Sequence, residues 1–339
     1  MHPVVSIIVP VYNRSAFLRP ALDSLFQQTF GDFEIVVVDD GSRDDTPVVL
    51  ANITDSRLKV ITHGTNLGIA EARNSGLEAA RGQYIAWLDS DDVCRRSRLE
   101  KQVRFLETHP EVALVGGCAG KIDARARRMR GIRVPPFDPK AVRACLVFKS
   151  AFQQSSVMGR ANVLKSMPYD GSFAVCEDTD LFVRLAARYR IANLPAMLVD
   201  RRIHEGQFSH QCSAQLCAAQ ARIGAPQLAA MGVQFTQEDL VRHACLARLS
   251  GAHLTDDYVR WADAWFNRLV QANRRTGTID GAALEFVTNV LRFQLRRRRG
   301  EAILSSVVRS RVLTSGAASW AALAASAAIR DQLHVQRSV

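Results

Sequence analysis

Hydrophobic runs alternate with helix-like spacing over the first 115 residues of the chain. Between the runs, apolar residues recur every three or four positions, as they do across residues 17–26 and 69–80. This alternation is typical of βαβ units, so we expect an α/β fold with a largely parallel sheet flanked by helices. The continuous apolar runs predict buried strands at residues 4–9, 33–38, 58–61 and 84–88.

Local signals predict where three helices begin or end. Ser15 is expected to be the N-cap of the first helix, because its hydroxyl can accept a hydrogen bond from a free N–H of the first turn. Thr46 is expected to cap the second helix, with Pro47 at the first helical position. Gly82 is expected to stop the helix at 69–80.

The periodicity weakens in the middle of the chain. Residues 116–150 are basic, show no regular pattern and contain the break Pro135-Pro136. Beyond them, the spacing predicts a helix at 177–189 and a pair of strands within 191–203. We expect this region to complete the domain begun by the first 115 residues.

The last third of the chain is helical in pattern and rich in Ala, Leu and Arg. Its aromatic residues, Trp261 and Trp265 among them, are expected to pack rather than to bind a ligand. The alanine-rich stretch 317–329 is shorter than the roughly 20 residues that a membrane span needs, so it predicts an amphipathic helix. We expect a helical C-terminal extension.

Composition and charge narrow the class of protein. Hydrophobic residues are 47% of the 339, enough for a full-sized core. The net charge of +11, with basic runs at 125–133 and 296–299, favours an acidic partner such as a nucleotide, anionic lipid or nucleic acid. The runs lack interleaved aromatic residues and no nucleic-acid-binding motif is present, so we expect no nucleic-acid partner. They are interpreted as a solvated face or a patch facing anionic lipid.

The cysteines and the N-terminus predict a location. The seven cysteines are odd in number and form no CxxC pair, which argues against a disulfide framework or a zinc site and for a reducing compartment. Residues 1–12 lack the basic start and long apolar stretch of a signal peptide. We therefore expect a cytoplasmic protein, either free or peripheral at the inner face of the plasma membrane.

Acidic residues follow two of the predicted strands. Asp39 ends the second run and Asp89–Asp92 follow the fourth, and the carboxyl ends of such strands form the ligand crevice of an open α/β sheet. In an extended conformation Asp89 and Asp91 would point the same way and could face one divalent cation, which prefers oxygen ligands. Asp92 is expected to cap the following helix or to support the site.

Seven motifs, in order and spacing, resemble those of family 2 glycosyltransferases. The resemblance covers about residues 3–210 and leaves out the last third of the chain. It implies the GT-A fold, a Rossmann-like, mixed and mostly parallel sheet flanked by helices. The motifs are Val5–Asn13, Val36–Ser42, Ala72–Gly76, Trp87–Asp92, Ser155–Met158, Cys176–Leu181 and Arg201–His204.

The resemblance implies a nucleotide-diphosphate sugar as donor, most simply a UDP-sugar. Asp39 would read the uracil with help from Asp40, and Arg73 would reach the base or the diphosphate as a fixed positive fork. The aromatic ring of Tyr12 would cover the base. The implied donor-binding residues are Pro10, Val11, Tyr12, Asn13, Asp39, Asp40, Arg73, Asp89 and Ser90.

The resemblance also implies Mn²⁺ or Mg²⁺ as cofactor. Asp91 would ligate the metal, Asp89 would lie toward the ribose and the metal, and His204 would complete the coordination or donate to a phosphate. The segment after His204, residues 205–209, would close over the diphosphate. The family has an aromatic residue and an arginine before the Ile-His pair, so Arg202 matches and Arg201 departs from the pattern.

The catalytic residues implied are Asp178 and Glu177. Acids in a first helical turn ordinarily interact with the helix dipole, but here Asp178 would be the general base that deprotonates the acceptor hydroxyl. Glu177 would orient Asp178 or contact the acceptor. Asp180 is the less favoured substitute.

The sequence thus predicts an inverting, metal-assisted glycosyltransferase acting on a growing glycan or lipid-linked glycan, of the hexosyl- or N-acetylhexosaminyltransferase class. A catalytically silent nucleotide-sugar-binding protein and a sugar nucleotidyltransferase are the alternatives. No GxGxxG follows the first strand, which excludes a Rossmann dinucleotide enzyme. The predicted divisions are a nucleotide-sugar-binding half at 1–115, an acceptor-binding and catalytic half at 116–212 and the helical extension at 213–339. The oligomeric state is not predicted.

Overall fold

The computed structural model describes residues 2–206, 213–246 and 254–300. The chain divides into two compact units. The first unit comprises residues 1–137 with 152–211, and the second comprises 138–151 with 212–339. The expected helix at 317–329 and the residues 207–209 of the predicted closing segment lie outside the described residues. The functional division at residues 115 and 212 stays a prediction, and it differs from the compact units in the placement of 138–151.

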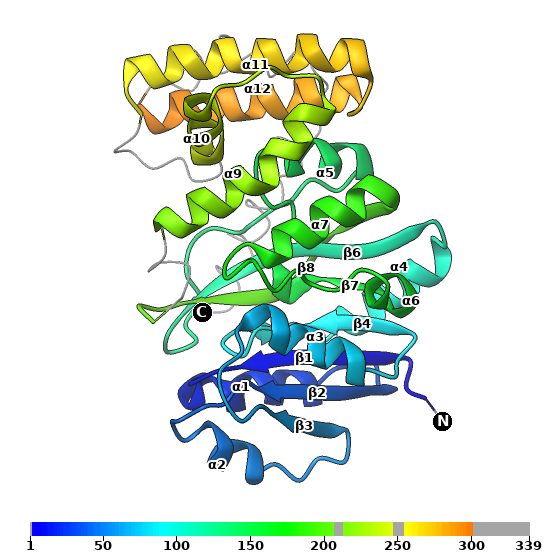
Figure 1. Cartoon of the computed structure of the whole chain (residues 1–339). Helices are drawn as coiled ribbons and strands as arrows, with labels where there is room; N and C mark the ends of the chain where they lie inside the picture. Colours follow the sequence, from blue (N-terminus) through cyan, green and yellow to red (C-terminus); the bar gives the residue numbers. More distant parts are fainter. Residues whose placement is uncertain (1, 207–212, 247–253, 301–339) are drawn as a thin grey trace. The chain divides into compact units, whose positions relative to one another are not determined.

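One mixed sheet organises the first unit. Within the described residues it has eight strands in the order β3-β2-β1-β4-β7-β6-β8-β5 (Figure 1). The first four run parallel, β7 is antiparallel to both of its neighbours, and β8 runs parallel to β6. The strands are β1 (Val5–Val11), β2 (Phe33–Asp39), β3 (Leu58–Thr62), β4 (Tyr84–Trp87), β5 (Val93–Cys94), β6 (Val112–Asp123), β7 (Met158–Arg160) and β8 (Arg190–Ile203).

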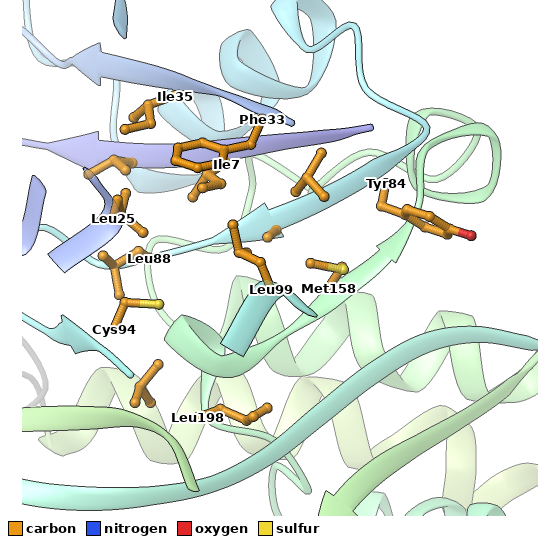
Figure 2. Packing of buried hydrophobic residues seen from close by; sticks show 14 of the residues in the cluster. Ile7, Leu25, Phe33, Ile35, Tyr84, Leu88, Cys94, Leu99, Met158 and Leu198 are labelled. Carbon is orange, nitrogen blue, oxygen red and sulfur yellow. The ribbon is translucent and has the colours of Figure 1, made fainter. Parts of the chain in front are cut away.

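Helices pack on both faces of this sheet. The buried cluster in Figure 2 joins one face of β1 and β2, through Ile7 and Ile35, to Leu25 and Leu99 of two helices. On the other face a helix approaches so closely that a Cβ at Gly76 would lie 2.4 Å from Ile8. The helical elements of the unit are α1 (Ser15–Phe26), α2 (Thr46–Ala51), α3 (Ile69–Ala79), α4 (Arg98–Thr108), the 3₁₀ turn η1 (Gln154–Ser156), α6 (Ala161–Lys165) and α7 (Glu177–Arg188).

The parallel strands and their helices confirm the α/β fold and the mixed, mostly parallel sheet. The predicted caps are wrong: α1 begins at Ser15, with Arg14 as N-cap, and α2 begins at Thr46, with Asp45 as N-cap. Neither N-cap side chain bonds the first turn. Arg14 N–H instead donates to the Thr46 hydroxyl at 3.1 Å, so this hydroxyl joins two loops rather than capping its own helix.

The middle of the chain is more regular than its pattern predicts. Strand β6 begins at Val112 and continues to Asp123, so most of it lies in the stretch 116–150 that was read as irregular. The predicted pair of strands within 191–203 is wrong because β8 is a single strand. Shifts in register occur near Gly117 and Cys118, where β6 pairs with β8. These irregularities break the alternation of polar and apolar residues that would have identified one long strand.

Two buried polar side chains of helix α4, Arg98 and Gln102, bind backbone carbonyls of the neighbouring elements. Arg98, fully buried, donates to the backbone carbonyls of Trp87 and Val157 at 2.9 and 3.0 Å. Gln102 donates to the carbonyls of Val115 and Ser156. These bonds tie α4 to β4, to β6 and to the turn η1, and they hold the end of β4 beside η1.

The second unit is helical in its described residues. Its core contains His243, whose Nε2 donates to the Val147 carbonyl at 2.8 Å while Nδ1 accepts from the Trp265 indole at 3.0 Å. Burial lowers the pKa of His243 to about 4, so the ring is neutral. Trp265 is buried and stacks on Trp261, which confirms their predicted packing role. The helices are α5 (Pro139–Leu146), α9 (Ser213–Ala230), α10 (Gln237–Cys245), α11 (Asp256–Thr276) and α12 (Gly281–Arg298).

No helix in the described part of the chain is long and apolar enough to cross a membrane.

Candidate functional site

The carboxyl ends of β1 and β2 are joined through Asn13. Its backbone, at a φ of 51°, lies in the left-handed region that asparagine tolerates. Its N–H donates to the Ser42 hydroxyl at 2.9 Å, and its side-chain oxygen accepts from Arg43 N–H at 2.8 Å. Before it, Pro10 and Val11 are buried, whereas the Tyr12 side chain is 39% exposed. Tyr12 is therefore the member of this loop whose ring is open to a ligand.

The two aspartates that end β2 are buried and differ in their partners. Asp39 accepts one hydrogen bond, from Ser42 N–H at 3.0 Å. Asp40 accepts from the backbone N–H groups of Leu67 and Gly68, both at 2.9 Å, and contacts His63 Nδ1 at 2.7 Å. Asp40 thus holds the loop before α3, and among the described residues the Asp39 carboxylate has fewer partners than that of Asp40.

The acidic segment Asp89–Asp92 is a turn, closed by a hydrogen bond from Asp92 N–H to the Asp89 carbonyl at 3.0 Å. The expected extended conformation is therefore wrong, and alternation along a strand does not align Asp89 with Asp91. Ser90 is buried in this turn. The Asp89 side chain is 31% exposed and contacts the Ser155 hydroxyl at 2.9 Å.

Asp92 supports the segment through buried contacts and does not cap a helix. It is 1% exposed, it is followed by β5, and its carboxylate accepts from Arg202 N–H at 2.9 Å and contacts the Ser155 hydroxyl. Burial, with the charges of Asp91 and Asp89, raises the pKa of Asp92 well above its usual range. Ser155 has one proton for two carboxylates, so a protonated Asp92 that donates to Ser155 satisfies all three groups.

Asp91 faces His204, with 3.0 Å between Asp91 Oδ2 and His204 Nε2. The His204 ring packs on Phe17 at 4.6 Å between centroids. The side chain of Arg202 donates to the Asp91 carbonyl at 2.8 Å, so it fixes the turn while Asp91 keeps its carboxylate toward His204. A carboxylate oxygen and an imidazole nitrogen suit a divalent cation. No group of three or more His, Cys, Asp or Glu side chains that could hold a metal is found in the described ranges.

Arg73 joins this segment to a second pair of acids. Its guanidinium lies 5% exposed, donates to Asp89 Oδ1 at 3.1 Å and forms an ion pair with Glu177. The Tyr169 ring lies under the guanidinium at 5.5 Å. Burial lowers the pKa of Arg73, but Glu177 and the other acidic groups around it together raise this pKa by more. The net pKa is therefore above the usual range and the side chain is charged.

Glu177 and Asp178 begin α7, as predicted, and they differ in exposure. Burial raises the pKa of Glu177 to about 7, although the charge of Arg73 opposes this. Asp178 is partly exposed, and its Oδ1 accepts from the backbone and the hydroxyl of Thr179 at 2.6 and 3.1 Å. No partner for Asp178 Oδ2 is found among the described residues, which leaves one carboxylate oxygen open to a substrate.

The structure therefore brings the predicted metal-binding and catalytic residues into two groups connected by Arg73, the Asp89–Asp92 turn with His204, and Glu177 with Asp178. The predicted base-binding residues Tyr12, Asp39 and Asp40 lie separately, at the ends of β1 and β2. The sequence did not predict the connections made by Ser155, Arg202 and Tyr169. Ser155 and Arg202 fall within the matched motifs, and that position was the available signal. Tyr169 falls outside every motif, and its hydroxyl accepts from the Gln154 amide at 2.9 Å.

Solved structures share this fold. TarS of S. aureus, determined with UDP-GlcNAc, superposes with a TM-score of 0.57 at 20% identity, covering 88% of each chain. A mannosyltransferase of Pyrobaculum calidifontis, determined with GDP-Man and Mn²⁺, gives a TM-score of 0.54 at 19% identity, covering 92% of this chain and 87% of that one. The fold is accordingly that of the GT-A transferases.

Sequence comparisons find similarity to glycosyltransferases. Residues 6–166 match the family model described as Glycosyl transferase family 2. An uncharacterized glycosyltransferase of Haemophilus influenzae is 28% identical over 61% of this chain and 68% of its own length. EpsJ of Bacillus subtilis, also an uncharacterized glycosyltransferase, is 46% identical over 34% of each chain. Over residues 6–166 the chain is therefore similar to glycosyl transferase family 2.

Proposed function

We propose that this protein transfers a sugar from a nucleotide-diphosphate donor, a UDP-sugar, to a hydroxyl of a growing or lipid-linked glycan with inversion at the anomeric carbon. The single observation that carries the proposal is the Arg73 bridge from Asp89 to Glu177. It joins carboxylates at the end of β4 to the start of α7. Leaving-group stabilisation and acceptor activation need such separate groups within one site.

Asp178 is the general base in this proposal. Its Oδ2 accepts the proton of the acceptor hydroxyl while that oxygen attacks the anomeric carbon from the face opposite the nucleotide. The bonds from Thr179 to Oδ1 keep the carboxylate in one orientation. Glu177, held by Arg73, fixes the first turn of α7 and so positions Asp178.

The donor occupies the ends of β1, β2 and β4. Tyr12 covers the base, Asp39 accepts from its N–H and Asp40 holds the adjoining loop in place. The backbone of Pro10, Val11 and Asn13 forms the wall beside the base. Ser90 and Asp89 lie toward the ribose, and Arg73 belongs to the donor site because it orients Asp89.

Asp91 and His204 would hold a Mn²⁺ or Mg²⁺, with Asp89 nearby and the remaining ligands coming from the diphosphate and water. Two facing donor groups are present, and such ions accept an incomplete protein set when phosphates supply further oxygens. The bound ion would neutralise charge on the departing diphosphate. The P. calidifontis neighbour was solved with Mn²⁺ and a nucleotide sugar, which supports a metal of this kind.

The donor class is the first thing to test. The full chain would be screened by thermal shift against UDP-, GDP- and dTDP-sugars with and without Mn²⁺, because a ligand specific for the folded state raises the melting temperature. We expect the largest shift with one UDP-sugar in the presence of Mn²⁺, together with slow hydrolysis of that donor. Shifts that are equal for every nucleotide and unaffected by Mn²⁺ would contradict the proposal.

The same screen separates the alternatives. A silent nucleotide-sugar-binding protein would show the shift and release no UDP with any acceptor. A sugar nucleotidyltransferase would form pyrophosphate from a nucleoside triphosphate and a sugar phosphate. The half-exposed Asp178, with an oxygen open to substrate, favours transfer over both.

We also propose, from the net charge of +11, that the enzyme acts in the cytoplasm at the inner face of an anionic membrane.

A further inference from the structure

The two basic runs of the chain differ in whether their positive charges are paired with carboxylates. In the run at 296–299, Arg296 pairs with Asp263 at 2.6 Å and Arg299 pairs with Asp256. These arginines fasten α12 to α11 within the second unit. Charges neutralised inside the protein attract a distant anionic surface weakly, so this run is the poorer candidate for binding one.

The second run lies on a loop of the first unit, residues 121–133, here called the basic loop. Its side chains at Lys121, Arg125, Arg128 and Arg130 are exposed. None of these four has a carboxylate within ion-pairing distance among the residues that the structure describes. Arg127 differs from these four, because it is paired with Asp123 at 2.7 Å. The loop therefore presents uncompensated positive charge to solvent.

The basic loop has a defined backbone. Met129 N–H donates to the Lys121 carbonyl at 2.9 Å, and the Asp123 carboxylate accepts from the N–H groups of Arg125 and Arg127, both at 2.9 Å. Isolated bridges pair Ile122 with Arg128 and Ala119 with Arg133. These bonds fix the backbone of the basic loop, so its arginines are kept close to one another.

Arg202 ties the basic loop to the site. Its Nη1 donates to the carbonyls of Asp123 and Ala124 at 3.1 and 3.2 Å, and its Nε donates to the Asp91 carbonyl at 2.8 Å. One buried guanidinium thus contacts both the base of the loop and the turn that carries Asp91. A surface bound by the loop is consequently close to the place where sugar transfer is proposed.

We propose that the basic loop is the surface by which this protein docks on an anionic lipid bilayer. Four unpaired cations and the Met129 side chain, 44% exposed between Arg128 and Arg130, suit a headgroup layer of negative charge with an apolar interior beneath it. The proposal rests on the proposed function in one respect: docking would bring the donor site to a lipid-linked acceptor. The docking itself is independent of any reaction.

The test is sedimentation of the full chain with vesicles of phosphatidylcholine alone or with 30% phosphatidylglycerol, at low salt and without donor or metal. The variant Arg125→Gln/Arg128→Gln/Arg130→Gln is compared with wild type. Each basic side chain near an anionic surface strengthens binding about fivefold, so we expect the triple variant to bind the anionic vesicles on the order of a hundredfold more weakly. Wild type should bind phosphatidylcholine vesicles poorly.

The matched control removes three exposed charges elsewhere, in Arg96→Gln/Lys101→Gln/Arg104→Gln, on α4 and just before it. Both variants lower the net charge from +11 to +8, so a general charge effect would weaken both equally. Equal binding by the two variants, or equal binding of wild type to neutral and anionic vesicles, would overturn the proposal. Donor hydrolysis in solution is measured in parallel. In wild type, hydrolysis without docking would contradict the docking proposal alone, and docking without hydrolysis would contradict the proposed function alone.

Discussion

The two carboxylate groups of the site are held in different ways. In the Asp89–Asp92 turn, Asp92 is buried against Ser155 and the backbone of Arg202, and Asp91 faces His204. At the start of α7 the deeper acid, Glu177, is paired with a buried arginine, while Asp178 keeps one oxygen free of described partners. Each group therefore has one acid that is buried against protein groups and one that is only partly buried.

This difference indicates how one site can perform two electrostatic tasks. A group that stabilises a leaving diphosphate works best when it is rigid and charged, and the turn is rigid because Ser155, Arg202 and Asp92 brace it. A general base must instead accept a proton, so it needs a carboxylate with solvent or substrate access. The comparison predicts that substitutions at Asp91 and at Asp178 impair different steps, leaving-group stabilisation in the first case and acceptor activation in the second.

The largest effect is expected at Asp178. Asp178→Asn preserves shape but removes the proton acceptor, so we expect kcat for transfer to fall about a thousandfold with little change in donor binding. Steady-state kinetics and the donor thermal shift would measure the two quantities. Asp180→Asn, two residues on, is the matched control because Asp180 is engaged by Arg184. A general-base role for Asp178 could not survive equal losses in both variants.

Asp91→Asn should weaken leaving-group stabilisation. We expect kcat/KM to fall by about a hundredfold and the Mn²⁺-dependent part of the donor thermal shift to disappear, because an amide is a poor ligand for such a cation. Asp55→Asn, which removes a carboxylate paired with Arg57, should leave both quantities at the wild-type level. A Mn²⁺-dependent shift that persists in Asp91→Asn would remove Asp91 from the metal site.

The sequence predicted the donor-side elements because each was encoded locally. The run Phe33–Val38 and the helix at 69–80 could be recognised from a few adjacent residues, and both elements are present. The start of α7 at Glu177 was predicted for the same reason. Strand β6 was missed because it combines glycines with a basic end, and nothing local marks its pairing with β8.

The contacts within the site depend on the tertiary fold. Arg73 was expected to reach the base or the diphosphate, but its contact with Glu177, 104 residues away, was not predicted. Tyr169, which lies beneath the guanidinium, carries no motif. Asp92 was expected to cap a helix or to support the site. It is followed by strand β5, and its carboxylate accepts a hydrogen bond from the backbone N–H of Arg202 in β8. Such pairs are specified by packing, and a pattern read along one chain does not contain them.

The buried acid at α7 predicts an unusual pH dependence. The pKa of Glu177 is raised from 4.5 to about 7, so between these values the folded state holds a proton that the unfolded chain has released. The contribution of Glu177 to stability is therefore largest below pH 4.5 and is lost as pH rises toward 7, by up to about 3 kcal/mol. Urea unfolding at pH 5 and 8 should show a smaller loss in Glu177→Gln than in wild type.

Glu34→Gln is the control for this measurement. Although burial raises the pKa of Glu34, its bonds to Arg81 lower it further, so Glu34 titrates below pH 4.5 and cannot contribute between pH 5 and 8. Its variant should keep the wild-type slope. Identical slopes for Glu177→Gln and wild type would show that Glu177 is ionised throughout that range.

The smallest effect is expected from Arg73→Lys, which tests the bridge between the two carboxylate groups. Lysine keeps a positive charge beside Glu177 and Asp89 but cannot contact both with a rigid fork, so we expect kcat to fall about tenfold and KM to stay near its wild-type value. Arg73→Gln should instead unfold at a markedly lower temperature, because it leaves Glu177 buried without its cation. Arg81→Lys is the matched control, since Arg81 holds a carboxylate at an exposed position. If Arg73→Lys has wild-type kcat, the rigid guanidinium is not needed to align the two carboxylate groups. The positive charge of residue 73 would then be sufficient.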